Sequence, residues 1–446
     1  MLAEPSTHAL RVAEAAAQLK SASGPIALDK RTSNLFRDRA AGRRQRLNLG
    51  ALTHVIGQDP AAGWVDVEGM TTYESLAAAT LLRGAMPAVV PQLKTITVGG
   101  AAAGVGIEAT SFRHGLVHDT IREIEVLLPD GEVVVCTPAN ACSDLFFGFP
   151  NSYGTLGYAV RLRLATVPVL PAVHVVHQRI AAADDFFDAL RQACAGNADF
   201  VDGVVFSRGE HVLSVGRFTS EPPWRSDYTY QDIYWRSLLA RGEDYLATPD
   251  YLWRWDTDWF WCSRNFGAQH LLVRWLLGRE RLNSRTYTRW MRLNARWQLA
   301  ARLARWRGRF RESVIQDVDI PIEAAGEFLR FLHSQIGVLP VWVCPVRGEL
   351  PQRKFPLYRL PAPLYVNFGF WDSIETRDRL EPGHFNRLVE REVLRLGGIK
   401  SLYSDSFFTR EAFDRAYGMD EYERLKSKYD PRRRAPGLFE KCVNRA

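Results

Sequence analysis

The stretch at residues 97–115, TVGGAAAGVGIEATSFRHG, constrains the fold most, because it carries five glycines and directly follows an apolar, strand-like segment. Glycine adopts positive φ angles at no steric cost, so this backbone can approach a bulky group closely. Consecutive amides in such a stretch form a concave set of N–H donors that can hold a pyrophosphate. The stretch therefore predicts a loop that cradles a phosphate-bearing cofactor.

A dinucleotide-binding pattern within this loop has to be weighed first. Gly104, Gly106 and Ala109 match GxGxxA, and Glu125 follows at about the distance expected of a ribose-binding acid. A Rossmann fingerprint opens a helix, whereas residues 110–115 read TSFRHG and lead into a strand-like segment. We therefore predict that the match is accidental.

The segments after the loop define an order of elements. Residues 124–128 and 132–136 flank a Pro-Asp-Gly turn and predict a hairpin. SDLF at residues 143–146 and GTLG at residues 154–157 follow, and another apolar strand runs to residue 164.

This order resembles the PCMH-type flavin-binding domain of the vanillyl-alcohol oxidase superfamily, in which FAD lies between two small α+β subdomains. Three further segments, QDVDIPI at residues 316–322, PVWVCP at 340–345 and LYSDSFFTREAFDRAYG at 402–418, resemble the Δ24-sterol reductase branch of that superfamily. Bacterial methylene-fatty-acyl reductases are similar through the same segments. Together the anchors cover nearly the whole chain.

The resemblance implies an α+β fold of several parts, and 446 residues are too many for one ordinary core. We expect an N-terminal helix within residues 1–23 and a two-subdomain FAD-binding domain at residues 24–170. An α+β substrate (cap) domain at residues 171–446 would follow, with a helical insertion rich in arginine and tryptophan at residues 222–312.

The resemblance also implies the cofactor-binding residues. They are Thr97, Val98, Gly99, Gly100, Gly104, Gly106, Ile107, Glu108, Ser111, Gly154, Thr155 and Gly157. Some relatives tether the flavin through a histidine in an early GGH-type loop, but here residues 31–39 read RTSNLFRDR, so non-covalent FAD is expected. No second nucleotide-binding fingerprint is visible, and we expect NADPH and the lipid to take turns at one flavin face.

Members of this branch take electrons from NADPH to saturate an isolated carbon–carbon double bond, which requires an acid beside the flavin. The candidate catalytic residues are Tyr403, Glu108, Asp405 and Asp317, with Asp319 as a further carboxylate. For each carboxylate an ion pair or a helix cap is an equally good interpretation, such as Asp405 before a helix that begins near Thr409.

Two lipids fit the branch. One is the Δ24 side-chain alkene of a sterol, and the other is a 10-methylene group on a phospholipid acyl chain, reduced to the methyl branch of tuberculostearic-type acids. Arginine and alanine dominate over lysine, as in a GC-rich bacterial gene, and this favours the acyl chain. Whether a SAM-dependent methyltransferase hands over the methylene lipid is left open. The alternatives are an FAD-dependent alcohol or sugar-lactone oxidase, and a lipid-binding protein without redox function.

The net charge is +7, and the positive excess is concentrated between Arg274 and Arg311. Arginines recur at Arg279, Arg281, Arg285, Arg289, Arg292, Arg296, Arg302, Arg305, Arg307 and Arg309. Leucines and tryptophans alternate with them, which is typical either of a helix at an anionic membrane surface or of a solvated helix pair whose tryptophans pack inward. Nucleic acid is not expected as a partner, because no known binding module surrounds the arginines.

Location and metal content follow from what the sequence lacks. No secretory signal and no apolar run of about 20 residues is present, so we expect a cytoplasmic protein that reaches lipid from the inner membrane face. The six cysteines show no ligand spacing, and no metal site is predicted.

Overall fold

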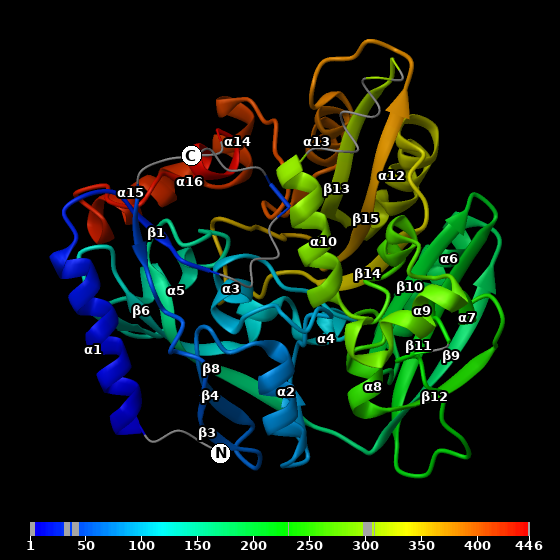
Figure 1. The fold of residues 1–446 in the computed structure, drawn as a ribbon, viewed down its shortest axis with the longest axis horizontal. Helices are drawn as coiled ribbons and strands as arrows, with labels where there is room; N and C mark the ends of the chain where they lie inside the picture. Colours follow the sequence, from blue (N-terminus) through cyan, green and yellow to red (C-terminus); the bar gives the residue numbers. More distant parts are fainter. Residues whose placement is uncertain are drawn as a thin grey trace.

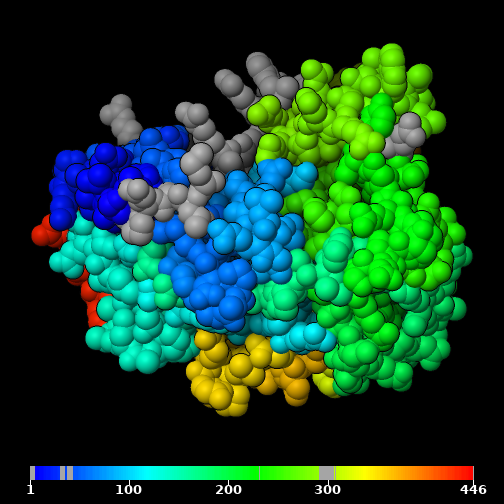
Figure 2. All heavy atoms as spheres, turned by 90° about the horizontal axis from the view of Figure 1, so that it is seen from below, coloured from blue at the N-terminus to red at the C-terminus, as the bar shows by residue number. Residues whose placement is uncertain are grey.

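The computed structural model describes residues 5–30, 36–37, 44–230, 232–297, 306 and 308–444. These residues form two large sheets, each covered by helices (Figure 1). In Figure 2 the blue and cyan atoms of the first part of the chain lie on one side, and the green atoms of the second sheet lie on the other. The predicted α+β class is confirmed.

The first sheet has six strands. They are β3 (Val55–Asp59), β4 (Trp64–Glu68), β5 (Ala85–Pro87), β6 (Ile121–Leu127), β7 (Val133–Cys136) and β8 (Tyr158–Pro168). Their order is β3-β4-β8-β6-β7, with β5 beside β8, and β6 and β7 form the predicted hairpin. Every pair is antiparallel, so the sheet has no parallel βαβ unit and the Rossmann interpretation is excluded.

Short helices and a parallel strand pair complete this part. They are α1 (Pro5–Ser21), β1 (Ile26–Leu28), β2 (Gln45–Leu47), α2 (Tyr73–Leu81), α3 (Val98–Ala103), α4 (Ser111–His114), η1 (Val117–Thr120) and α5 (Ser143–Gly148). Two of them correct the prediction of a continuous loop at residues 97–115. The Thr97 hydroxyl accepts a hydrogen bond from the Gly100 amide (3.2 Å) and so starts α3. One helical turn, α4, directly follows Thr110.

Helix α3 lies directly on the main chain of the first sheet. The Gly99 amide donates to the Gly69 carbonyl, just beyond β4, at 2.8 Å. A Cβ at Gly99 would lie 2.7 Å from that oxygen, and a Cβ at Gly69 would lie 1.9 Å from the Ala159 oxygen. Only glycine fits at these two positions, which fixes the course of the glycine-rich segment.

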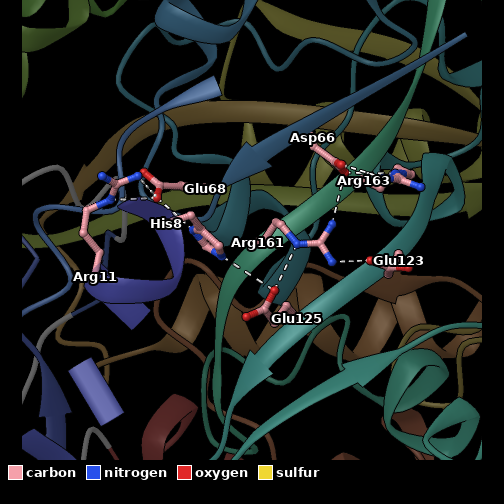
Figure 3. Close-up of polar contacts among 8 residues, drawn as sticks. All are labelled: His8, Arg11, Asp66, Glu68, Glu123, Glu125, Arg161 and Arg163. Atoms are coloured by element: carbon pink, nitrogen blue, oxygen red, sulfur yellow. Dashed lines mark hydrogen bonds and ion pairs between the residues drawn. The ribbon is translucent and has the colours of Figure 1, made fainter. Parts of the chain in front are cut away.

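A partly buried ion-pair network attaches α1 to this sheet (Figure 3). His8 Nδ1 and Arg11 Nη2 lie 2.9 and 2.6 Å from Glu68 Oε1. On the neighbouring strands, Arg161 Nε donates to Glu125 Oε2 at 3.0 Å. Glu125 is therefore a structural partner of Arg161 and not a ribose ligand.

This network predicts a dependence of stability on pH. Burial alone would lower the pKa of His8, but its bonds to Glu125 and Glu68 raise it to about 9. Burial alone would raise the pKa of Glu68, but its bonds to His8, Arg11 and His54 lower it to about 2. We expect the His8 contribution to be complete below pH 6.5 and lost as the pH rises toward 9. The Glu68 contribution is complete above pH 4.5 and lost as the pH falls toward 2.

Urea unfolding from pH 6 to pH 9.5 measures the His8 limb of this dependence. His8→Gln should flatten that limb, whereas His174→Gln, which removes a half-exposed histidine paired with Glu243, should leave it in place. Equal slopes for the wild-type protein and His8→Gln would contradict the assignment.

The second sheet has eight strands. They are β9 (Ala172–Ile180), β10 (Phe200–Ser207), β11 (Glu210–Thr219), β12 (Glu243–Ala247), β13 (Phe310–Pro321), β14 (Val341–Arg347), β15 (Leu364–Thr376) and β16 (Ile399–Lys400). Their order is β12-β9-β11-β10-β14-β15-β13-β16. The helical segments that accompany it are α6 (Ala183–Ala195), η4 (Ile322–Ala324), α12 (Ala325–Phe331), η5 (Leu332–Ile336) and α13 (His384–Arg395). Of these, η4, α12 and η5 follow one another without a break.

Where it is described, the insertion between β11 and β13 contains short helices, irregular segments and the strand β12. Its helices are α7 (Tyr234–Ser237), α8 (Thr248–Leu252), η2 (Cys262–Phe266), α9 (Leu271–Leu277), η3 (Arg279–Arg281) and α10 (Ser284–Trp297). Strand β12 corrects the prediction of an all-helical excursion: it pairs with β9 at the sheet edge, and its acidic residues hide the strand pattern. The predicted arginines Arg302, Arg305 and Arg307 lie outside the described residues.

Three C-terminal helices return to the first part of the chain. They are α14 (Arg410–Ala416), α15 (Met419–Tyr429) and α16 (Leu438–Cys442). The Tyr429 hydroxyl donates to Asp144 in α5 at 2.6 Å, so α15 lies against the first domain although it comes near the end of the sequence (Figure 1). The domain limits given above stay a prediction. No helix among the described residues combines the length and apolar composition needed to cross a bilayer.

Candidate active site

The two glycine-rich segments predicted to bind one cofactor lie against each other. The Tyr153 amide donates to the Ala103 carbonyl at 2.7 Å, and the Asn151 amide donates to the Gly104 carbonyl at 3.2 Å. Asn151 and Tyr153 have φ angles of 61° and 51°, a region that non-glycine residues rarely adopt. These contacts therefore hold GTLG beside the end of α3.

The unpaired amide donors of the first segment lie in its second half. The amides of Val98, Gly99 and Gly100 are used within the protein, by Thr71, Gly69 and the Thr97 hydroxyl respectively. By contrast, the amides of residues 105–107 have no hydrogen-bond partner among the described residues. Unpaired main-chain donors call for a ligand or water. The candidate anion-binding donors thus lie after α3 and not at its start.

Side-chain atoms beside these segments also lack partners. The Ser152 hydroxyl and the Asn151 side-chain oxygen are buried without a hydrogen bond in the described protein. Side chains at positions 103, 105 and 107 keep accessible surface while the residues between them are buried. The arrangement fits a polar group that runs along residues 103–107 and past residues 151–157.

The carboxylate of Glu108 is held by a buried arginine that sequence reasoning missed. Arg254 Nη2, in the insertion, donates to Glu108 Oε1 at 3.0 Å and to Asp202 Oδ2 at 2.8 Å. All three side chains are almost completely buried. Burial raises the pKa of Glu108 to about 7, against the opposing charge of Arg254. Ser111, another predicted residue, accepts the Glu108 amide at 3.1 Å.

Asp317 and Tyr403, predicted from separate segments, lie together. Trp371 Nε1 donates to the Tyr403 hydroxyl at 2.8 Å, and that hydroxyl interacts with the Asp317 carboxyl. Burial raises the pKa of Asp317 well above its ordinary range, and Tyr403 only partly opposes this. Asp317 Oδ1 has no hydrogen-bond partner among the described residues.

The pairing of β13 with β15 produces this meeting. Asp317 lies opposite Gly369, and a Cβ at Gly369 would lie 2.7 Å from Asp317 Oδ1 and 2.6 Å from the Trp371 ring. Asp317, Trp371 and Tyr403 lie deep in the protein and yet keep accessible surface. The three side chains therefore lie close together and are only partly exposed.

Phe36 and Arg37 join this cluster to the glycine-rich segments. The Phe36 ring stacks on Trp259 at 5.6 Å and meets Tyr403 edge-on at 5.7 Å. The Arg37 guanidinium lies 4.9 Å from the Tyr153 ring centre and donates to the Leu402 carbonyl. Both belong to residues 31–39, whose sequence indicates only that no histidine is present to tether the flavin. The other residues of this stretch lie outside the described part of the chain.

The remaining predicted acids are engaged elsewhere. Asp319 accepts hydrogen bonds on both oxygens, from Tyr358 (2.6 Å) and Asn367 (2.8 Å), and burial raises its pKa to about 6. The Asp405 carbonyl accepts a bond from the buried Lys400 ammonium. The cap of α14 is Thr409, whose hydroxyl accepts the Ala412 amide, so the expectation that Asp405 caps this helix is wrong.

A buried lysine of the C-terminal helix α15 holds Thr155 of the GTLG segment in place. The Lys426 ammonium, fully buried in α15, donates to the Thr155 carbonyl at 2.6 Å and pairs with Asp430 at 2.6 Å. A buried lysine requires such partners because an unpaired ammonium in the interior is costly. Lys426 therefore fixes the position of the second glycine-rich segment.

Comparison with known proteins identifies the class. Residues 4–137 match the family described as an FAD binding domain, which covers α1 and the glycine-rich segment up to β7. Together with the antiparallel fold and the converging glycine-rich segments, this makes the chain an FAD-dependent oxidoreductase.

The similarity extends beyond this domain. The chain is 24% identical to the Δ24-sterol reductase of Arabidopsis thaliana, over 90% of this chain and 76% of that protein. It is also 24% identical to the human Δ24-sterol reductase, over 89% of this chain and 77% of that protein. Cytokinin dehydrogenase 7 of rice is 33% identical, but only over 32% of this chain and 25% of that protein. The predicted resemblance to the sterol-reductase branch is confirmed.

Proposed function

We propose that the chain uses FAD and NADPH to saturate an isolated carbon–carbon double bond of a lipid. The similarity to Δ24-sterol reductases over most of the chain supports this. FAD, when bound, supplies hydride to the double bond. An isolated alkene accepts hydride poorly, so the protein must also deliver a proton, which leaves cation character at the more substituted carbon. Proton and hydride together saturate the bond, and NADPH replaces the two electrons.

The buried carboxyl of Asp317, whose Oδ1 forms no hydrogen bond within the described protein and which lies beside Tyr403, is the observation that carries this proposal. Burial raises the pKa of this carboxyl well above its ordinary range, which favours the protonated, proton-donating form. We assign Asp317 the role of proton donor and Tyr403 the role of holding its carboxyl in place. The rings of Phe36 and Trp371 suit an apolar alkene and limit the access of water.

Glu108 is better suited to positioning than to proton transfer, because it is already engaged with Arg254. In that role it connects the glycine-rich segment to the insertion. We assign no catalytic role to Asp405.

For the cofactor we propose that the amides of residues 105–107 bind the pyrophosphate and that residues 154–157 lie against the flavin. Lys426 then supports cofactor binding from behind. We expect Lys426→Met to lower the FAD content after gel filtration several-fold, because Thr155 loses its anchor and Asp430 is left unpaired. Lys428→Met, which removes a half-exposed lysine of the same helix, is the matched control and should retain FAD. Equal FAD content in the two variants would contradict the assignment.

Two substrates remain in competition. The relatives' names favour the Δ24 alkene of a sterol. The arginine-rich composition and the exposed apolar face of α9 favour a 10-methylene acyl chain of a membrane phospholipid. Both alkenes give a tertiary cation on protonation, so one site chemistry serves either. A SAM-dependent methyltransferase is the partner class that the second substrate requires.

Anaerobic stopped-flow absorbance of the yellow protein tests the proposal. NADPH should bleach the flavin, and subsequent addition of a Δ24-sterol or of liposomes with 10-methylene acyl chains should restore its colour. Recovery with only one of these lipids identifies the substrate. Recovery with oxygen alone would point to an oxidase, and the absence of bleaching would refute the use of NADPH.

A further inference from the structure

Helix α9 presents an apolar face to the outside of the protein. Leu271, Leu272, Trp275 and Leu276 are 73%, 66%, 70% and 69% exposed. Their spacing places them on one side of a helix. Scattered exposed leucines are ordinary, but four adjacent large apolar side chains indicate an interaction surface.

The opposite side of α9 is firmly anchored. Arg274 is buried, with Nη1 2.6 Å from Asp258 Oδ1 and Nε donating to the Tyr230 carbonyl at 2.7 Å. Its Nη2 also donates to the Asp232 carbonyl. Since an arginine paired in the interior cannot leave without a large cost, α9 cannot turn its apolar face inward.

Arginines follow this face along the chain, in η3 and in the first turns of α10. Arg279, Arg281, Arg285 and Arg289 are exposed, and Glu280 is the only acidic residue between positions 271 and 290. Arg279 pairs with Asp227 and Arg285 pairs with Glu74. Arg281 and Arg289 form no ion pair within the described residues, so their charges are available to an anionic surface.

The tryptophans of the insertion divide into two groups. Trp255, Trp259 and Trp261 are buried in the core, as the inward-packing interpretation predicted. Trp275 is exposed and lies between the leucines of α9. An indole at the edge of an apolar face and beside arginines is typical of helices that lie in the interface of a bilayer.

We propose that α9 docks the protein on an anionic bilayer by inserting Leu271, Leu272, Trp275 and Leu276 among the lipids, with the arginines on the phosphates. A second copy of the chain fits this face less well, because a two-fold contact of residues 271–290 would offer the arginines only Glu280 as an acidic partner. The lipid nature of the substrate rests on the proposed function, but the docking itself does not require catalysis.

A row of aromatic rings runs from this surface to the candidate acid. Leu277 at the end of α9 and Phe266 both pack against the same hydrophobic core. From there the rings continue through Tyr287 (6.0 Å), Trp259 (6.4 Å) and Phe36 (5.6 Å) to Tyr403 (5.7 Å). The aromatic surroundings of Asp317 thus continue from the second sheet into the insertion that carries α9.

Flotation with vesicles tests the docking. We expect the wild-type protein to float with phosphatidylcholine vesicles that contain about 30% phosphatidylglycerol, and to float less with phosphatidylcholine alone or in high salt. Trp275→Glu should reduce the bound fraction at least about ten-fold, since it places a charge in the apolar face. Leu10→Glu, at a leucine on α1 that is 66% exposed, is the matched control and should float like the wild type.

The other outcomes of flotation and sedimentation also test the docking proposal. Equal flotation of Trp275→Glu and the wild type would overturn the proposal. If the wild type bound no vesicles but self-associated in sedimentation, and Trp275→Glu did not self-associate, a second copy of the chain would cover α9. This result would also overturn the docking proposal. Lipid dispersed in detergent distinguishes docking from catalysis, because it can reach the active site without a bilayer. We expect Trp275→Glu still to reduce the double bond of such a lipid. Flotation without turnover of any lipid would refute the proposed function and leave the docking intact.

Discussion

Replacing Asp317 with asparagine is expected to slow alkene reduction by about 10²–10⁴-fold, the usual contribution of a positioned general acid. The amide is nearly isosteric, so the contact with Tyr403 is preserved while the transferable proton is lost. Reduction of the flavin by NADPH needs no proton on the alkene and should proceed at the wild-type rate. Stopped-flow measurement of the two half-reactions separates these effects.

The neighbouring carboxylate on the same strand provides the control. Asp319→Asn also removes a buried carboxylate from β13, but Asp319 is engaged by Tyr358 and Asn367 and has no free oxygen for a substrate. We expect it to lower stability and to leave the rate of alkene reduction within about ten-fold of the wild type. Equal losses of rate in the two variants would remove Asp317 from its role as proton donor.

The pH dependence gives a second readout for Asp317. Because burial raises its pKa, the proton-donating form of Asp317 persists to a higher pH than that of an ordinary aspartate and declines as the pH rises through the raised pKa. Alkene reduction by the wild type should therefore be level at acidic pH and fall as the pH rises through that pKa. In Asp317→Asn this decline should vanish, whereas a merely structural role would leave the profile unchanged.

The separate parts of the site could be predicted from sequence because each lies in a short contiguous motif. The glycines at residues 99–106 and 154–157 indicate that the main chain approaches another group closely. Asp317 and Tyr403 lie in two segments that were recognised through the family resemblance. Their meeting could not be predicted, since it depends on the register of β13 with β15 and on the absence of a Cβ at Gly369.

Residues whose partners are distant in sequence gave no local signal. Arg254 lies 146 positions from Glu108 and 52 from Asp202, and in the sequence it is one more arginine among tryptophans. Phe36 reaches Tyr403 and Trp259 from a polar stretch. The buried and the exposed tryptophans lie in one insertion rich in arginine and tryptophan, so the sequence does not distinguish them. Only the ion pair of the buried Arg274 shows which face of α9 is outside.

Loss of Arg254 should destabilise the protein by about 3–5 kcal/mol, because Arg254→Met leaves Glu108 and Asp202 as uncompensated buried carboxylates. Urea unfolding at pH 8 measures the change, since at that pH Glu108, with a pKa raised to about 7, is mostly charged when Arg254 is present. The cost should shrink in Arg254→Met/Glu108→Gln/Asp202→Asn, where no charge is left to compensate.

Arg264 offers a matched control in the same insertion. It pairs with Asp372 at 2.6 Å, a distance similar to that of the Arg254 pairs, but its side chain is 34% exposed. Water can therefore solvate Asp372 when the arginine is lost, and Arg264→Met should cost only about 0–1 kcal/mol. If both variants lost the same stability, burial would not be what distinguishes the two ion pairs. In that case Arg254 would contribute no more to the free energy of unfolding than a partly exposed arginine does, although it connects the glycine-rich segment, the insertion and the second sheet.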